Sequence, residues 1–306
     1  MDVLAIFNPS ASRVDPASRE AVLRALSPRC SVEAVCTDHP FHAAELAAEA
    51  AAQGARLVVA VGGDGTANEA ANGLAGTQTP LWCLPGGSTN VFARTVGSPR
   101  RLEAASAQLA ERIRNPVVRR ITTGVVNERH FLFMSGLGVT AEMMRRVATH
   151  PVLRARLGAA YVAVGAVVAL AEAGRGRLPR LLVEAGGEHS EAATVIVQRS
   201  DPLTFFGPRP VSVCRPGQLG DGTLSMALAD GVAPRDVASL FVRLLSGDPQ
   251  RVTAHPRVSA FESLPSLRVS AVGGRSFGVE VDGTYMGEAT SVQYGVAPDS
   301  LLVAGP

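Results

Sequence analysis

The residues best suited to chemistry form a glycine-rich loop, Gly62–Thr66 (Gly-Gly-Asp-Gly-Thr), which follows an apolar run and precedes a helical segment. Glycines allow close backbone approach, and the N–H groups of such a turn, with a helix N-terminus behind them, suit phosphate. A carboxylate beside a triphosphate is repelled unless a divalent cation lies near both, so Asp64 indicates Mg²⁺. The alternative is an ordinary strand-to-helix turn capped by Asp64 or Thr66.

The same pattern occurs again about twenty residues further on. The apolar run Leu81–Leu84 leads into Pro85–Asn90, and a helix start follows at Val91. Two successive units place both loops at the carboxyl ends of parallel strands, where open α/β sheets bind ligands. Ser88 would supply an uncharged donor and Arg94 a cation, so the repetition favours a nucleotide site over two unrelated turns.

The elements that position these loops divide the chain into two predicted domains. Residues 1–121 alternate apolar strands with helices, which predicts a three-layer α/β domain with a parallel sheet. Residues 122–295 carry short strands separated by glycine and proline, including 130–134 and 211–214, which predicts a β-sandwich-like domain. Helical insertions are expected at 140–149, 152–173 and 234–245, and we expect 296–306 to return to the first domain as a strand.

Composition excludes several classes of function. The chain has no lysine, which rules out a Walker-A loop, a protein kinase and Schiff-base catalysis, and its net charge of +2 gives no case for nucleic-acid binding. Four cysteines without a C-x-x-C pair indicate reduced thiols. The N-terminus lacks a basic leader, and the longest uncharged stretch, 157–171, is shorter than the ~18 residues that span a bilayer. We therefore expect a cytoplasmic protein that is not integral to a membrane.

Taken together, the motifs resemble the diacylglycerol-kinase catalytic family, with its bacterial lipid kinases and the related sphingosine kinases. The matching segments, in chain order, are Asn8-Pro9-Ser10, Thr37 with His42-Ala43, Gly62–Glu69 with Asn72-Gly73, Leu84–Arg94, Phe131–Ala141, Gln218–Leu224 and Val281-Asp282-Gly283. The resemblance implies a fold shared with NAD kinases and diacylglycerol kinases. It also implies phosphorylation by ATP of a hydroxyl on diacylglycerol or a related lipid, at an anionic membrane surface to which the protein is peripherally attached.

The resemblance assigns roles to particular positions. It implies that ATP contacts come from Asn8, Pro9, Ser10, Thr37, Gly62, Gly63, Asp64, Gly65, Thr66, Asn68, Glu69, Ser88 and Asn90. It implies a structural Mg²⁺ held by Asp221 with main-chain oxygens of Gln218 and Thr223.

Three positions depart from the family pattern, and the mildest is Ser88, where a serine replaces a threonine. Thr284 stands where the family has its general-base glutamate, and Val91 where an aspartate is usual. A threonine hydroxyl is far too weak a base at neutral pH, so activity is expected to be reduced. Asp64, Asp282 and Thr284 are the candidate catalytic positions. Asp282 is the nearest substitute base, unless it only forms an Asp-Gly hairpin turn, and Glu288 is a distant second.

Several interpretations stay open at this level. The chain is a lipid kinase, a catalytically weakened nucleotide or lipid sensor, or an NAD kinase-like enzyme that shares the Gly-Gly-Asp-Gly-Thr loop. The arginines that flank 157–170 (Arg145, Arg146, Arg154 and Arg156) form either a basic rim for anionic lipid or the solvated end of a core helix. Residues 204–207 wall a lipid pocket or, in the favoured interpretation, pack the β core. The lipid and homodimerisation are not determined.

Overall fold

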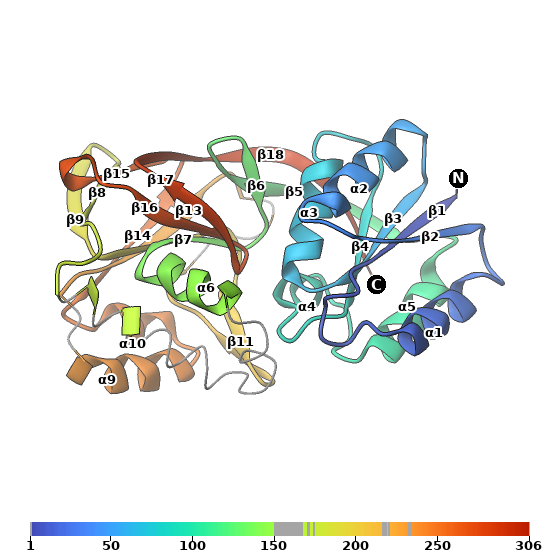
Figure 1. Cartoon of the computed structure of the whole chain (residues 1–306), viewed down its shortest axis with the longest axis horizontal. Helices are drawn as coiled ribbons and strands as arrows, with labels where there is room; N and C mark the ends of the chain where they lie inside the picture. Colours follow the sequence, from blue (N-terminus) through green and yellow to red (C-terminus); the bar gives the residue numbers. More distant parts are fainter. Residues whose placement is uncertain are drawn as a thin grey trace. The chain divides into compact units, whose positions relative to one another are not determined.

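The computed structural model describes residues 2–149, 168–169, 172–173, 175–215, 219, 221–231 and 234–305. These residues belong to two compact units (Figure 1). The first comprises Met1–Thr123 and Ala297–Pro306, and the second comprises Gly124–Val296. The boundaries predicted from the sequence lie within two residues of this division.

The first unit is a parallel sheet covered by helices on both faces. Its elements are β1 (Val3–Phe7), α1 (Pro16–Leu26), β2 (Val32–Cys36), α2 (His42–Ala52), β3 (Leu57–Gly62), α3 (Asp64–Leu74), β4 (Leu81–Pro85), α4 (Val91–Thr95) and α5 (Leu102–Arg112). The strand order is β2-β1-β3-β4, with every pair parallel. Helices α1 and α5 pack on one face, and α2 and α3 pack on the other (Figure 1). This arrangement confirms the predicted three-layer α/β fold.

Burial explains why the strands of this sheet read as continuous apolar runs. Every residue of β1, β3 and β4 is buried, because helices cover both faces of the sheet. Helix α1 begins where the Asp15 side chain accepts the N–H of Ser18, the Ser18 hydroxyl accepts the N–H of Asp15, and Pro16 takes the first helical position. The last strand of the chain, β18 (Ser291–Gly305), adds to this sheet through a parallel pair between Val303 and Leu81.

The second unit is built mainly from antiparallel strands. Its elements are β5 (Val117–Val126, shared with the first unit), β6 (Arg129–Phe131), β7 (Met134–Gly138), α6 (Val139–Thr149), β8 (Leu181–Ala185), β9 (Glu188–Ala192), β10 (Thr194–Gln198), β11 (Thr204–Phe206), β12 (Arg209–Val211), β13 (Leu224–Ala229), α9 (Pro234–Leu245), α10 (Pro249–Thr253), β14 (Val258–Leu264), β15 (Leu267–Ala271), the 3₁₀ turn η1 (Val272–Gly274), β16 (Phe277–Val281) and β17 (Thr284–Ala289). One sheet has the order β14-β13-β10-β7-β16-β17, and in the other the first residues of β18 pair with β15, followed by β8 and β9.

The two sheets of this unit share one hydrophobic core. Leu137, Val195 and Met226 from the six-stranded sheet lie in the same buried cluster as Val269 and Tyr294 from the other sheet. Two sheets that enclose a common core form a sandwich, which confirms the predicted β-sandwich-like domain. Helix α6 packs on the six-stranded sheet against β7 and β16.

Some predicted elements differ from the structure. The strand expected at 130–134 is divided into β6 and β7, because the N–H groups of residues 132–134 bind the Asp282 carboxylate instead of a neighbouring strand. The strand expected at 211–214 lies earlier, at Arg209–Val211. Helices at 140–149 and 234–245 are confirmed, whereas most of the helix expected at 152–173 lies outside the described residues. Among the described helices, none is long and apolar enough to cross a membrane.

Candidate functional site

The residues predicted to contact nucleotide gather at one end of the parallel sheet. The strands β1, β2, β3 and β4 all point the same way, and the predicted positions follow their last residues: Asn8, Pro9 and Ser10 after β1, Thr37 after β2, Gly63 to Glu69 after β3, and Ser88 and Asn90 after β4. Backbone hydrogen bonds join these segments, from Asn8 N–H to Val61 O at 3.0 Å and from Thr37 N–H to Phe7 O at 2.8 Å. The sheet therefore places two glycine loops and two further loop starts around one region.

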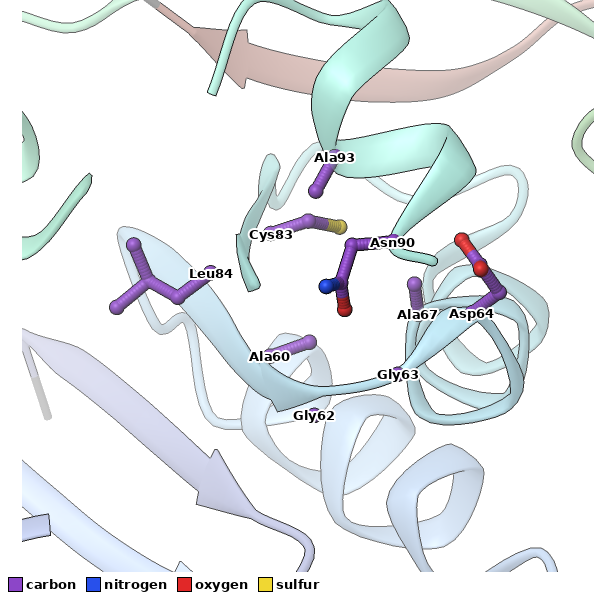
Figure 2. A pocket seen from close by; sticks show the side chains of 9 residues that line it. All are labelled: Ala60, Gly62, Gly63, Asp64, Ala67, Cys83, Leu84, Asn90 and Ala93. Atoms are coloured by element: carbon purple, nitrogen blue, oxygen red, sulfur yellow. The ribbon is translucent and has the colours of Figure 1, made fainter. Parts of the chain in front are cut away.

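The two glycine loops touch each other through their backbones. The N–H of Gly86 donates to Gly62 O at 2.8 Å. A Cβ on Gly86 would lie 2.9 Å from the Gly62 Cα, and a Cβ on Gly87 would lie 2.6 Å from the Gly63 Cα. No side chain fits at such distances, so glycine is required where the loops meet. The crevice shown in Figure 2 lies between the β3–α3 segment (Ala60 to Ala67) and the β4–α4 segment (Cys83 to Ala93), and it is too narrow for a water molecule.

Asp64 joins the two loops. It lies in the first turn of α3, and its Oδ1 accepts the N–H of Phe92 at 3.0 Å, near the start of α4. Burial raises the pKa of Asp64, and hydrogen bonds from the Val91 and Phe92 N–H groups and the Thr89 hydroxyl act against that rise. The carboxylate thus caps the helix that follows the second loop (Figure 2). The sequence left helix capping as an alternative role for Asp64. The structure shows such a cap, but on α4 instead of α3.

Other predicted nucleotide residues also support the loops. The Asn8 amide donates to the Thr66 hydroxyl at 2.9 Å and accepts the N–H of Ser10 at 2.9 Å. The Asn90 side chain is buried and closes its own turn by two hydrogen bonds with Gly87, at 2.7 and 2.8 Å. The Glu69 carboxylate accepts the N–H of Ala43 at the start of α2, at 3.3 Å.

The hydroxyls of Ser10 and Ser88 are exposed, and Arg94 lies half-buried one turn into α4. Burial lowers the pKa of Arg94, and so does the charge of Arg100. These side chains, together with the N–H groups of the glycine loop, are the groups that this end of the sheet presents for an anion.

The predicted metal loop in the second unit holds a buried positive charge. Gln218 lies outside the described residues, the Asp221 side chain is exposed, and Thr223 is half-buried. Arg199 is fully buried, and its guanidinium donates to Leu219 O at 2.8 Å and to Asp221 O. Carboxylate and carbonyl oxygens are the donors that Mg²⁺ prefers, but a guanidinium in the same loop opposes a second cation. The described part of this loop, which excludes Gln218, therefore fits a structural Mg²⁺ poorly.

Asp282 is a fixed structural group. It is 1% exposed with φ of 47°, and its carboxylate accepts the N–H groups of Leu132, Phe133 and Met134 at 2.7, 3.0 and 3.1 Å. Three N–H donors occupy the carboxylate oxygens that would receive a proton. This arrangement argues against the expected role of Asp282 as a substitute base. Thr284, at the start of β17, is exposed.

Glu280 is a buried acid that the sequence reasoning missed. It is 3% exposed, and burial, with a smaller contribution from the Asp282 charge, raises its pKa to about 8. A Cβ on Gly136 would lie 2.4 Å from the Glu280 Oε1 and also 2.4 Å from the Thr140 Oγ1, so the carboxyl lies between β7 and α6. The sequence feature that could have identified Glu280 is an acid within an apolar strand, two residues before Asp282.

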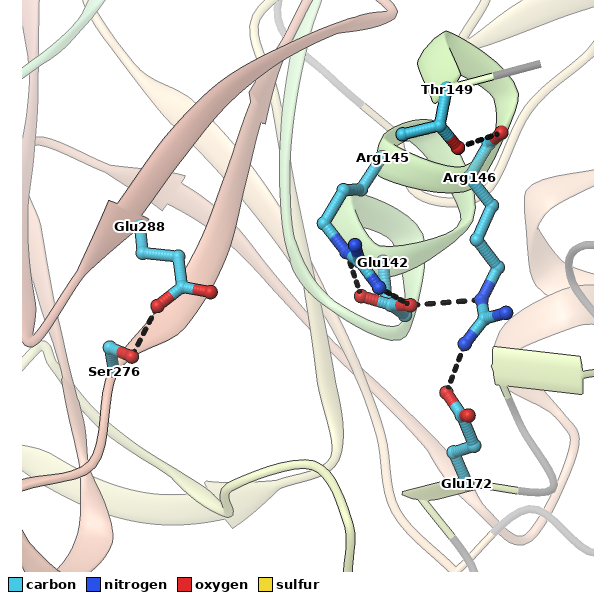
Figure 3. A network of polar contacts seen from close by, with 7 residues as sticks. All are labelled: Glu142, Arg145, Arg146, Thr149, Glu172, Ser276 and Glu288. Atoms are coloured by element: carbon cyan, nitrogen blue, oxygen red, sulfur yellow. Dashed lines mark hydrogen bonds and ion pairs between the residues drawn. The ribbon is translucent and has the colours of Figure 1, made fainter.

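The arginines expected to form a basic rim are partly neutralised. Arg145 pairs with Glu142 at 2.7 Å, and Arg146 bridges Glu142 at 2.8 Å and Glu172 at 2.6 Å (Figure 3). These two arginines therefore supply little free charge for anionic lipid. Arg154 and Arg156 lie outside the described residues. Glu288, the second candidate base, is exposed and accepts a hydrogen bond from the Ser276 hydroxyl (Figure 3).

Comparison with known proteins places the first unit in a kinase family. Residues 2–123 match the family model described as the diacylglycerol kinase catalytic domain. The chain is 40% identical over 112 residues to a "Diacylglycerol kinase" of Bacillus subtilis, a match that covers 35% of this chain and 34% of that protein. It is 32% identical over 209 residues to a "Probable lipid kinase YegS-like" of Pseudomonas putida, with 67% and 66% covered. The matches span from about a third to about two thirds of these relatives.

Solved structures agree with the fold. A crystal structure of a diacylglycerol kinase from Bacillus anthracis superposes with a TM-score of 0.67 at 17% identity, covering 100% of this chain and 97% of that one. Another structure from the same organism gives a TM-score of 0.71 at 19% identity with the same coverage. The matched domain, the relatives and the shared fold together place this chain in the diacylglycerol kinase catalytic-domain family of lipid kinases.

Proposed function

We propose that the protein transfers a phosphoryl group from ATP to a hydroxyl of diacylglycerol or a related lipid, in the cytoplasm at the surface of a membrane. The observation that carries the proposal is the pair of glycine loops in backbone contact at the carboxyl end of a parallel sheet. Family membership supports the kinase chemistry and favours a lipid over the NAD substrate of the alternative reading. The second unit would present the lipid.

In this proposal the first unit binds the nucleotide through its backbone. The N–H groups of Gly62 to Thr66 and the N-terminus of α3 would bind phosphate oxygens, with Ser88 and Arg94 adding a hydroxyl and a positive charge. Asp64 would act indirectly, by holding the second loop and α4 in place. Mg²⁺ that arrives with ATP would neutralise charge on the transferred phosphate.

The two acids that precede Thr284 in the chain, Asp282 and Glu280, are poorly suited to act as its substitute base. Asp282 is occupied by three N–H donors, and Glu280 is buried with its pKa raised to about 8. General-base help is worth roughly 10²–10⁴-fold in rate, whereas positioning and electrostatics supply most of the catalysis in phosphoryl transfer. The enzyme is therefore expected to turn over slowly.

The test is transfer of radiolabelled phosphate from ATP to diacylglycerol and to sphingosine in mixed micelles. Lipid-dependent product formation supports the proposal. Nucleotide turnover that no lipid stimulates contradicts it.

A nucleotide- or lipid-binding sensor is the second candidate, because Thr284 and the occupied Asp282 both weaken the case for catalysis. Calorimetric binding of Mg-ATP without any product, in both the wild type and a Thr284→Glu variant, would favour the sensor.

A further inference from the structure

Three large apolar side chains of the second unit lie exposed on β11 and α9. Phe206 is 49% exposed, Phe241 is 48% exposed and Val242 is 69% exposed. The rings of Phe206 and Phe241 meet edge to face, with centroids 6.4 Å apart and planes at 88°. We call these three residues the aromatic patch. Large apolar side chains that gather on a surface mark a site of interaction.

The patch is held by packed elements. Helix α9 is anchored through Leu244, which packs against the buried residues Val213 and Val252. Val242 lies on nearly the opposite side of the helix from Leu244, which packs inward, and Phe241 lies between them around the helix. Phe206 is fixed by the β11–β12 hairpin, where it lies directly opposite Arg209. The two exposed rings thus belong to elements that are held in place by packing and strand pairing.

The segments that carry the patch have more arginines than acids in sequence. Residues 204–215 and 234–257, which form the hairpin, α9, α10 and their flanks, contain six arginines and two aspartates. The whole chain has a net charge of +2, so the remainder carries a net negative charge. Arg209 is exposed opposite Phe206 in the hairpin, whereas Arg251 on α10 pairs with Asp248, with 3.7 Å between Nε and Oδ2. Excess positive charge around exposed aromatic rings complements an anionic lipid surface.

We propose that the aromatic patch docks the second unit on an anionic bilayer. Phe206, Phe241 and Val242 enter the boundary between headgroups and acyl chains, while Arg209 contacts lipid phosphates. Aromatic rings beside arginines are typical of interfacial anchors, because the rings are buried while the guanidinium stays among the headgroups. The proposal goes beyond the proposed function by naming the docking surface, and vesicle binding tests it without any turnover.

The experiment is sedimentation of the full chain with phosphatidylglycerol vesicles and, separately, with phosphatidylcholine vesicles, at low and high salt. Wild type should bind phosphatidylglycerol more tightly, and salt should weaken that binding. The double variant Phe206→Ser/Phe241→Ser should lose about tenfold in partitioning for each phenylalanine removed. Arg209→Gln should reduce binding to phosphatidylglycerol and leave binding to phosphatidylcholine unchanged.

Val117→Ser is the matched control, because Val117 is 54% exposed and belongs to the first unit. It should bind vesicles as the wild type does. Val242→Ser serves as a second patch variant if circular dichroism shows that the double variant is unfolded. Unchanged vesicle binding of a folded patch variant overturns the proposal. A lipid-free wild-type dimer that the patch substitutions convert to monomer also overturns it, by assigning the patch to a second copy of the chain.

Activity separates this proposal from the proposed function. A folded patch variant should phosphorylate dispersed dioctanoylglycerol at the wild-type rate, because this short-chain lipid needs no docking on a bilayer. Wild-type protein that binds vesicles through the patch but phosphorylates no lipid would refute the lipid-kinase proposal and leave the docking surface supported.

Discussion

Replacing Glu280 by glutamine removes an ionisable group from the interior of the second unit without changing its shape. Glu280 is 3% exposed, and burial raises its pKa from the ordinary 4.5 to about 8. Because the folded-state pKa is the higher one, the folded protein binds this proton more tightly than the unfolded chain does. The stability from this group is therefore complete below about pH 4.5 and is lost as the pH rises towards 8.

The size of the effect follows from the width of that window. Each pH unit within it costs about 1.4 kcal/mol of unfolding free energy. Between about pH 5 and about pH 7.5 the wild type should thus lose roughly 3 kcal/mol relative to Glu280→Gln. Glutamine resembles the protonated acid, so the two proteins should have similar stability near pH 4.5 and the variant should be the more stable one near pH 8.

Urea unfolding of both proteins across this pH range measures the difference, and groups that titrate equally in the two proteins cancel. Glu288→Gln is the control, because Glu288 is an exposed acid on the adjacent strand β17, opposite Gly278. The assignment of a raised pKa to Glu280 would be refuted if the difference in unfolding free energy between wild type and Glu280→Gln stayed constant with pH. It would also be refuted if Glu288→Gln gave the same difference.

Three further perturbations test the candidate site. Asp64→Asn should weaken Mg-ATP binding and cost about 1 kcal/mol of stability, because the cap on α4 loses its charge. Titration calorimetry measures the affinity, with Glu103→Gln as the control. An unchanged affinity for Mg-ATP contradicts the prediction. Thr284→Glu should raise kcat by about 10²–10⁴-fold with little change in the KM for ATP; a variant no faster than the wild type contradicts it. In the absence of nucleotide, a chelator should leave the Tm of the wild type unchanged. Mg²⁺ should raise the Tm of Arg199→Ser, because no guanidinium opposes the ion in that variant. A fall in the wild-type Tm on adding chelator would show that the wild type holds a metal.

The sequence determined the architecture of the first unit because its signals are local. Apolar runs such as Val3–Phe7 and Leu57–Val61, each followed by helical spacing, require a sheet buried on both faces. Parallel strands end on the same side, so two glycine loops after two such strands had to come together. The two-unit division and the second unit's antiparallel character were also readable, from the change to short strands with glycine and proline between them.

The roles of individual polar residues were decided by tertiary contacts. Asp64 caps α4, twenty-eight residues away in sequence, and Asp282 binds N–H groups about 150 residues away. Glu280 alternates with the core residues Val279 and Val281, so the sequence alone places it on the side away from the core. Helix α6 covers that side, and the resulting burial raises the pKa of the acid.

The same limit applies to surface charge. Arg145 and Arg146 are arginines beside an apolar segment in sequence, but acids on α6 and at residue 172 neutralise them. Phe206 and Phe241 lie thirty-five residues apart, and only the packing of α9 beside β12 brings them together at the surface. The spacing of apolar residues and the composition of a segment determine its backbone structure, because both act over a few residues. The charge, protonation and exposure of a side chain depend on what the folded chain places against it.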